Sequence, residues 1–275
     1  MPVPDVIRRS TPPPHVTLIA AVRAEFQKSR RSAALRAAII APIVLVLVAL
    51  VLSVLSSSGL TVAAHNFCLN VWNWWYSLFL PGTVGIVASS IMQLDRRLGM
   101  RGVLGVPGSP ALAFVAKAVF GVVMTLFSML IVALASIVVP LALGGVGAPL
   151  PDVLLATLLI TLTGAWLVPL ALALTARCGM LAGFAVTFLG DVAIGVFAWQ
   201  MGLIGALTPS SVRLLAMVPV LGIMPNGLPY DVSSPYAVFV SDDLGTYAAG
   251  IMVSVVACVA ITALASRAFS KREAR

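Results

Sequence analysis

Long apolar runs alternate with short polar stretches along most of the chain. Six runs are long enough to cross a hydrocarbon core of about 30 Å, which takes roughly 20 residues of helix. They lie at about 36–58, 76–94, 111–144, 152–175, 180–206 and 246–268. The pattern predicts an all-α membrane protein, with one six-span domain over residues 16–275.

The third run is longer than a single crossing requires. At about 1.5 Å per residue, a helix over 111–144 reaches roughly 50 Å. We therefore expect its first turns to project into the cytosol or to lie along the interface. Lys117 lies in these turns, and we expect its ammonium group to extend to the membrane surface.

An amphipathic segment precedes the first span. Residues 16–31 carry an apolar stripe at helical spacing, formed by Val16, Leu18, Ile19, Val22 and Phe26. This stripe predicts a helix lying in the inner interface, and the alternative is a basic flank that only anchors the first span. Residues 1–15 are rich in proline and predict a disordered cytosolic lead.

Positive charges are distributed unevenly between the two sides of the predicted bundle. The chain is 60% hydrophobic and 9% charged, with 17 Lys and Arg against nine acids. Six spans place all basic residues except Arg213 on one side, and the positive-inside rule makes that side cytosolic. We expect a multi-pass protein of a bacterial plasma membrane with both termini in the cytosol.

Composition also excludes several classes of protein. No polar segment is long enough to fold into a nucleic-acid-binding module, so the basic excess indicates orientation in the lipid bilayer. The three cysteines, Cys68, Cys178 and Cys258, are scattered singly. This spacing suggests neither a disulfide framework nor a zinc site.

Two features are predicted for the outer side. The stretch "HNFCLNVWNWWYS" places Trp72, Trp74, Trp75 and Tyr76 where an interfacial aromatic belt belongs, although an aromatic box for a cation is the alternative. Residues 207–245 are apolar but contain five prolines, so no single helix can run through them. We expect short helices on the outer surface or dipping into it, or a loop packed over the bundle.

Motifs that support catalysis are missing from the sequence. It contains no H-E-x-x-H, no G-x-S-x-G and no G-x-x-x-x-G-K-[ST]. We therefore expect a transporter and not an enzyme, with no catalytic, cofactor-binding or metal-binding residues. Asp191 falls near the middle of the fifth span. A carboxylate there is costly, and it predicts either a structural or protomer contact or a proton relay.

The segment "QLDRRLGMRGVLGVPGSP", residues 93–110, lies between the second and third spans. A short amphipathic helix here would direct Asp95, Arg96, Arg97 and Arg101 to the cytosol. Glycines and Pro107 would form a turn beyond it. This charged knob could bind a soluble partner, or the segment could be a basic loop that only fixes topology.

Three segments carry a resemblance to a known family: "AEFQKSRRSAALR", "DRRLGMRGVLGVPGSPALAFVAK" and "LGIMPNGLPY". With the six spans, they resemble permease subunits of ABC exporters of the second type, and the chain is most similar to lantibiotic-immunity permeases. The resemblance implies a coupling helix with Asp95 as its acid and Pro107 as its turn proline. It makes Lys117 the lysine that opens the third span.

The resemblance also implies partners. A separate ATP-binding subunit would bind ATP and Mg²⁺, and a second permease, the same or a related chain, would complete the pathway for an amphipathic peptide. Two other functions stay open. One is a proton-coupled secondary transporter that uses Asp191, and the other is a membrane scaffold or assembly factor whose inner loop recruits a partner.

Overall fold

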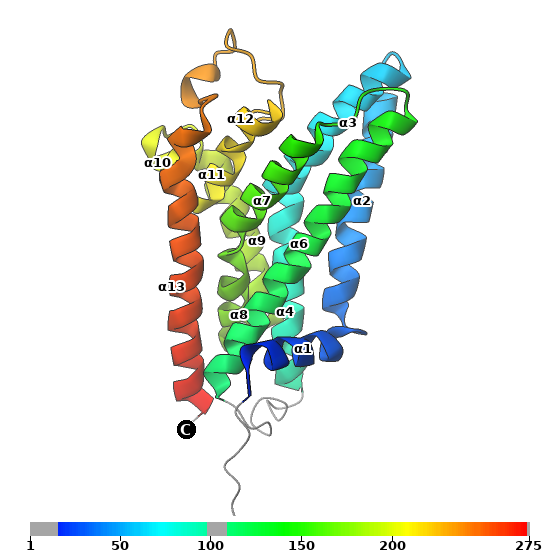
Figure 1. The fold of residues 1–275 in the computed structure, drawn as a ribbon. Coiled ribbons are helices and arrows are strands. Elements are labelled where there is room, and N and C mark those ends of the chain that lie inside the picture. The colour runs from blue at the N-terminus through cyan, green and yellow to red at the C-terminus, as the bar shows by residue number, and fades with distance from the viewer. Residues whose placement is uncertain (1–15, 98–108, 274–275) are drawn as a thin grey trace, which may run out of the picture.

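A computed structural model describes residues 16–97 and 109–273, and within them six helical stretches are long and apolar enough to cross a membrane (Figure 1). The six-span prediction is therefore confirmed. The stretches are Ala33–Leu55 (α2), Leu60–Arg97, Pro110–Ala142 (α6), Leu150–Cys178, Met180–Ala198 (α9) and Leu244–Lys271. The lead over 1–15, Arg101 and Pro107 lie outside the described residues.

The second span begins well before the predicted residue 76. It consists of α3 (Leu60–Trp74), a π-helical turn η1 (Trp75–Phe79) and α4 (Leu80–Arg97). Its start resembles a loop in sequence because it contains asparagines. These asparagines form hydrogen bonds with α2 and with the turn after it: Asn70 donates to Ser53 on α2 at 3.1 Å, and Asn66 donates to Ser57, just beyond α2, at 2.9 Å.

The predicted aromatic belt is wrong for three of its four residues. Trp72, Trp75 and Tyr76 are buried in the core. The Trp75 indole N–H donates to the sulfur of Met129 on α6. Because this part of the chain is helical, the aromatic side chains pack between helices and do not form a ring at the membrane surface.

The third span is one continuous helix, α6, which Figure 1 shows inclined across the bundle. Ser109 caps its start by accepting a hydrogen bond from the backbone N–H of Leu112 at 3.2 Å, and Pro110 follows at the first helical position. α1 (Leu18–Ser29) packs against the first turns of α6.

The fourth span is broken into α7 (Leu150–Gly164) and α8 (Leu167–Cys178). Pro169 lies just after the break, and it has no N–H to donate to the carbonyl of Ala165. Below the break, α8 packs tightly with α4 and α9, and the hydroxyl of Thr175 donates to Ser89 at 2.8 Å. Small and hydroxyl side chains allow this close approach.

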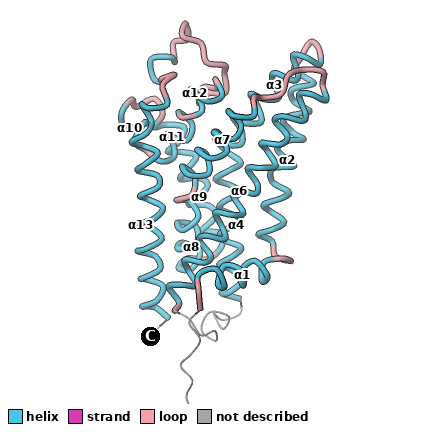
Figure 2. The backbone as a smooth tube through the Cα atoms, in the orientation of Figure 1, coloured by secondary structure: helices cyan, strands magenta, loops and turns pink. Residues whose placement is uncertain are grey.

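Short helices occupy one end of the bundle, opposite α1. They are α10 (Leu203–Leu207), α11 (Pro209–Leu215) and α12 (Met217–Leu221), followed by the 3₁₀ turns η2 (Ala237–Phe239) and η3 (Leu244–Tyr247). Nearly all of α11 is buried, so this part of 207–245 dips into the bundle, whereas Val232 and Val238 farther along are exposed. The last helix, α13 (Ala248–Glu273), returns to the end where α1 lies across the bundle (Figures 1 and 2).

Candidate functional site

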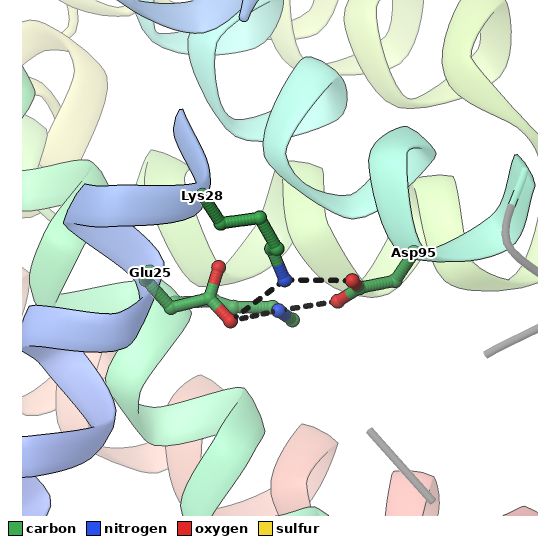
Figure 3. Close-up of polar contacts among 4 residues, drawn as sticks. Glu25, Lys28 and Asp95 are labelled. Carbon is green, nitrogen blue, oxygen red and sulfur yellow. Dashed lines mark hydrogen bonds and ion pairs between the residues drawn. The ribbon is translucent and has the colours of Figure 1, made fainter. Parts of the chain in front are cut away.

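Four charged side chains meet where α1 crosses the ends of α4 and α6. The Lys28 ammonium lies 3.0 Å from the Glu25 carboxylate, its neighbour one turn away on α1, and 2.6 Å from the Asp95 carboxylate on α4. Figure 3 shows Glu25 and Lys28 reaching from α1 toward Asp95. Lys117 of α6 lies 2.5 Å from Glu25 and also pairs with Asp95. We call these four residues the inner charge cluster.

The inner charge cluster is largely shielded from water. The side chains of Asp95 and Lys117 are fully buried, and those of Glu25 and Lys28 are mostly buried. Buried charges are tolerated when opposite charges pair with them, and here two carboxylates face two ammonium groups. Burial alone would lower the pKa of Lys28, but the charges of Glu25 and Asp95 and hydrogen bonds to both outweigh it and raise the pKa above 10.5. Lys28 is therefore charged at neutral pH.

The sequence of α1 explains how it is fixed to the bundle. Glu25 and Lys28 are three residues apart, so both side chains lie on one side of the helix. On the same helix, the ring of Phe26 contacts that of Phe120 on α6 edge to face, with centroids 6.1 Å apart. An ion-pair network and an aromatic contact therefore attach α1 to the ends of α4 and α6.

The structure corrects two predictions about the candidate coupling residues. Asp95 does not face the cytosol, because both lysines of the cluster bind its carboxylate inside the protein. Lys117 does not extend to the surface, because Glu25 and Asp95 pair with it where it is buried. Arg96 and Arg97 are exposed, as predicted. Arg96 also donates to the carbonyl of Thr175 near the end of α8 at 2.5 Å.

A second buried ion pair lies deeper in the bundle. The guanidinium of Arg213 on α11 is 2.5 Å from the Asp191 carboxylate on α9 and also donates to the carbonyl of Tyr76 at 2.9 Å. In a π-helical turn, that carbonyl would accept from residue 81. Residue 81 is proline and has no N–H. The carbonyl of Tyr76 therefore has no backbone donor from residue 81, and the guanidinium of Arg213 donates to it instead.

Sequence reasoning missed this ion pair. It assigned Asp191 no basic partner and placed Arg213 alone on the side opposite the other basic residues. The structure pairs the two because α11, at the end opposite α1, folds into the bundle, where Arg213 is buried. The signal in the sequence was one isolated acid and one isolated base, each in otherwise apolar surroundings. Sequence reasoning also missed Glu25 and Lys28 as members of a site.

Comparison with known proteins identifies the family. A family model described as an ABC-2 family transporter protein matches residues 21–197, more than half of the 275-residue chain. The match includes all four residues of the inner charge cluster and Asp191. No curated protein and no solved structure matches the chain. The chain therefore belongs to the ABC-2 family of transporter proteins and is a membrane permease of an ABC transporter.

Proposed function

We propose that the chain is the permease subunit of an ATP-driven exporter, and that the end carrying α1 faces the cytosol. A separate subunit binds ATP and Mg²⁺ and docks beside the exposed Arg96 and Arg97. The inner charge cluster is the observation that carries this proposal. It fixes the last turn of α4, where those arginines lie, to both α1 and α6.

The cluster gives the docking end a mechanical connection to the rest of the bundle. Moving α4 away from α6 would separate Asp95 from Lys117 and leave buried charges without partners, which is strongly unfavourable. A force applied at Arg96 and Arg97 therefore moves α1, α4 and α6 together. Because α6 is continuous over 33 residues, its displacement reaches the opposite end of the bundle.

The second ion pair extends this connection. The span that ends at Arg97 contains Tyr76, whose carbonyl binds Arg213, and Arg213 in turn binds Asp191 on α9. Displacement of α4 is thereby passed to α11 and to the short helices beside it. We infer that these outer helices change position during the transport cycle.

An amphipathic peptide, such as a lantibiotic or a related antimicrobial, is the proposed substrate. A cavity of about 610 Å³ lies between α3, the start of α7 and α12, at the end opposite α1, and Trp72, His65 and Asp152 are among its lining residues. Aromatic, apolar and acidic groups together suit a peptide with a cationic portion. A second permease, the same chain or a related one, would complete the transport path and confer immunity or resistance.

A double charge reversal tests the proposal. Arg96→Glu with Arg97→Glu should abolish co-purification with the ATP-binding subunit expressed from the same cell, while the protein still inserts into the membrane. The control is Arg267→Glu with Lys271→Glu, which changes the same charge at exposed positions on α13 at the same end. Unchanged association of the Arg96 and Arg97 variant would contradict the docking assignment.

The proton-coupled alternative is weaker than the sequence suggested. It depended on Asp191 alone, and in the structure the Asp191 carboxylate forms a buried ion pair with Arg213. The ion pair instead supports a structural role for Asp191 within the permease.

A further inference from the structure

A seam between α2, α4 and α9 contains two hollows arranged along the bundle. The first, of about 330 Å³, lies at the end carrying α1. Its lining residues come from the turn before α2 and the first turn of α2, from the last turns of α4 and from the start of α9. They are Arg31, Ser32, Ala33, Arg36, Ser90, Gln93, Leu94, Arg97 and Met180.

The charge of this inner hollow is entirely positive. Arg31, Arg36 and Arg97 line it, no acid does, and none of the three arginines forms an ion pair with another described residue. Residues 98–108, which follow Arg97 in the sequence, contain no Asp or Glu. Guanidinium groups bind phosphate oxygens in a two-pronged geometry, so three of them around one hollow favour a phosphate group.

An unpaired hydroxyl group supports a ligand in the same hollow. Ser90, on the wall formed by α4, is only 8% exposed, and its Oγ has no hydrogen-bond partner among the described residues. Buried hydroxyl groups normally form hydrogen bonds. A phosphate oxygen in the hollow would accept one from Ser90.

The second hollow continues the seam toward the middle of the bundle. It has a volume of about 260 Å³ and is lined by Ala41, Leu78, Phe79, Gly82, Thr83, Ile86, Phe184 and Phe188. The stacked rings of Phe184 and Phe188, 5.5 Å between centroids, form its α9 side. Residues 184–188 follow Met180 by one to two helical turns, which places this apolar hollow about 6–12 Å deeper than the basic one.

The seam is also open on the outside of the protein. Ile40, one turn beyond Arg36 on α2, is 55% exposed, and Leu181, next to Met180 on α9, is 78% exposed. Exposed apolar side chains therefore border the seam. A molecule that fits the two hollows therefore has an anionic head near the interface and a hydrocarbon tail inside the bilayer.

We propose that the seam binds an anionic membrane phospholipid, with its phosphate held by Arg31, Arg36, Arg97 and the Ser90 hydroxyl and one acyl chain in the apolar hollow. The proposal rests on the proposed cytosolic position of the end carrying α1, but not on the identity of the transported substrate. Basic pockets between transmembrane helices at the cytosolic interface favour such headgroups. The bound lipid would join the turn before α2 to the ends of α4 and α9.

Native mass spectrometry of the full-length permease tests the proposal with short-chain phosphatidylglycerol, phosphatidylcholine of the same chain length, and inorganic phosphate. We expect the wild-type protein to prefer phosphatidylglycerol. Arg31→Gln with Arg36→Gln should weaken that binding about thirtyfold, because each basic residue near the headgroup contributes about a factor of five. Arg23→Gln with Arg30→Gln removes two exposed arginines outside the hollow and should weaken it less than threefold.

A variant in the apolar hollow separates a lipid from a free anion. Ala41→Phe fills the tail site without changing charge, so we expect it to weaken phosphatidylglycerol binding at least fivefold and to leave phosphate binding unchanged. The proposal would be overturned if the two lipids bound equally, if the control pair of arginines mattered as much, or if phosphate bound as tightly as phosphatidylglycerol. It would also be overturned if the Arg31 and Arg36 variant kept its lipid and lost only the ATP-binding subunit.

Discussion

Charged residues inside this bundle are held by opposite charges. Five of the charged residues described are buried, namely Glu25, Asp95, Lys117, Asp191 and Arg213, and each has an ion-pair partner. Replacing one member of such a pair is costly because it leaves the other charge buried and uncompensated. The stability of the permease therefore depends on both members of each pair.

The Asp191 and Arg213 pair gives a direct test at this scale. Asp191→Asn leaves the guanidinium of Arg213 buried without a countercharge and should lower the free energy of unfolding by about 3–5 kcal/mol. Thermal unfolding in detergent, followed by size-exclusion chromatography, measures the loss. Asp152→Asn changes a partly exposed acid that forms no ion pair with another described residue and is the control.

Removing both charges should restore much of the lost stability. A double variant, Asp191→Leu with Arg213→Met, contains no uncompensated charge, although it leaves the Tyr76 carbonyl without its donor. We expect its melting temperature to lie above that of Asp191→Asn. If Asp191→Asn and Asp152→Asn melted at the same temperature, the buried ion pair would contribute nothing to stability.

The sequence identified Asp191 as a buried acid but could not supply its partner. Hydropathy places Asp191 in a membrane span, whereas Arg213 lies in a proline-rich stretch that is typical of a surface segment. Only the fold of α11 brings the two side chains together. The same limit applies to Lys117 and Asp95, which the sequence marks as important. Their partners on α1, Glu25 for Lys117 and Lys28 for Asp95, are distant along the chain.

Among the helices, the packing of α8 against α9 depends on a missing side chain. A Cβ atom added at Gly183 would lie 1.9 Å from the Thr175 hydroxyl oxygen and 3.0 Å from the Ala171 carbonyl. The two helices therefore approach one another too closely for any larger residue. Thr175 also binds Ser89 on α4, so this contact orders three helices.

Gly183→Ala should therefore destabilise the protein by about 1–3 kcal/mol, because α8 and α9 must separate to accept a methyl group. Gly190→Ala on the same helix is a matched control, since no atom lies within 4 Å of the added Cβ. Alanine favours a helix over glycine, so the control should unfold at an equal or higher temperature. Equal destabilisation of the two variants would exclude close packing as the cause.

The ion pairs of Lys117 attach α1 to α4 and α6, so loss of this charge should loosen α1. Lys117→Met removes the charge that joins Glu25 to Asp95, so α1 should separate from α6 more often. Hydrogen exchange of residues 18–29 should accelerate at least tenfold, with little change in α13. Lys271→Met, at an exposed site at the same end, should leave the exchange of α1 unchanged. Unaltered exchange in Lys117→Met would show that the cluster does not hold α1.

The sequence predicted membrane-spanning helices reliably wherever hydropathy alone determines whether a segment spans the membrane. The six spans were predicted because each is a long and strongly apolar helical stretch. The start of the second span was missed because Asn66 and Asn70 lower its hydropathy, although their side chains donate hydrogen bonds to Ser57 and Ser53. The break at Pro169 follows from proline chemistry, but the sequence does not show which prolines break a span and which are tolerated, as Pro42 is within α2.

At the scale of the whole molecule, the permease has two different ends. One carries α1, the inner charge cluster and the exposed Arg96 and Arg97, and the other carries α10, α11, α12 and the loop between α6 and α7 (Figure 1). Docking of an ATP-binding subunit at Arg96 and Arg97 requires the first end to be cytosolic, because the nucleotide is available only there. The direction of the chain in the membrane therefore decides whether this docking is possible.

Cysteine labelling in intact cells measures this direction. Cys178, exposed at the end of α8, reports on the end with α1, and Val146→Cys reports on the opposite end. The remaining native cysteines are replaced by alanine in each protein. We predict that a membrane-impermeant maleimide labels the Val146→Cys protein in intact cells and labels Cys178 only after the membrane is permeabilised. Labelling of Cys178 in intact cells, with protection of Val146→Cys, would contradict the account.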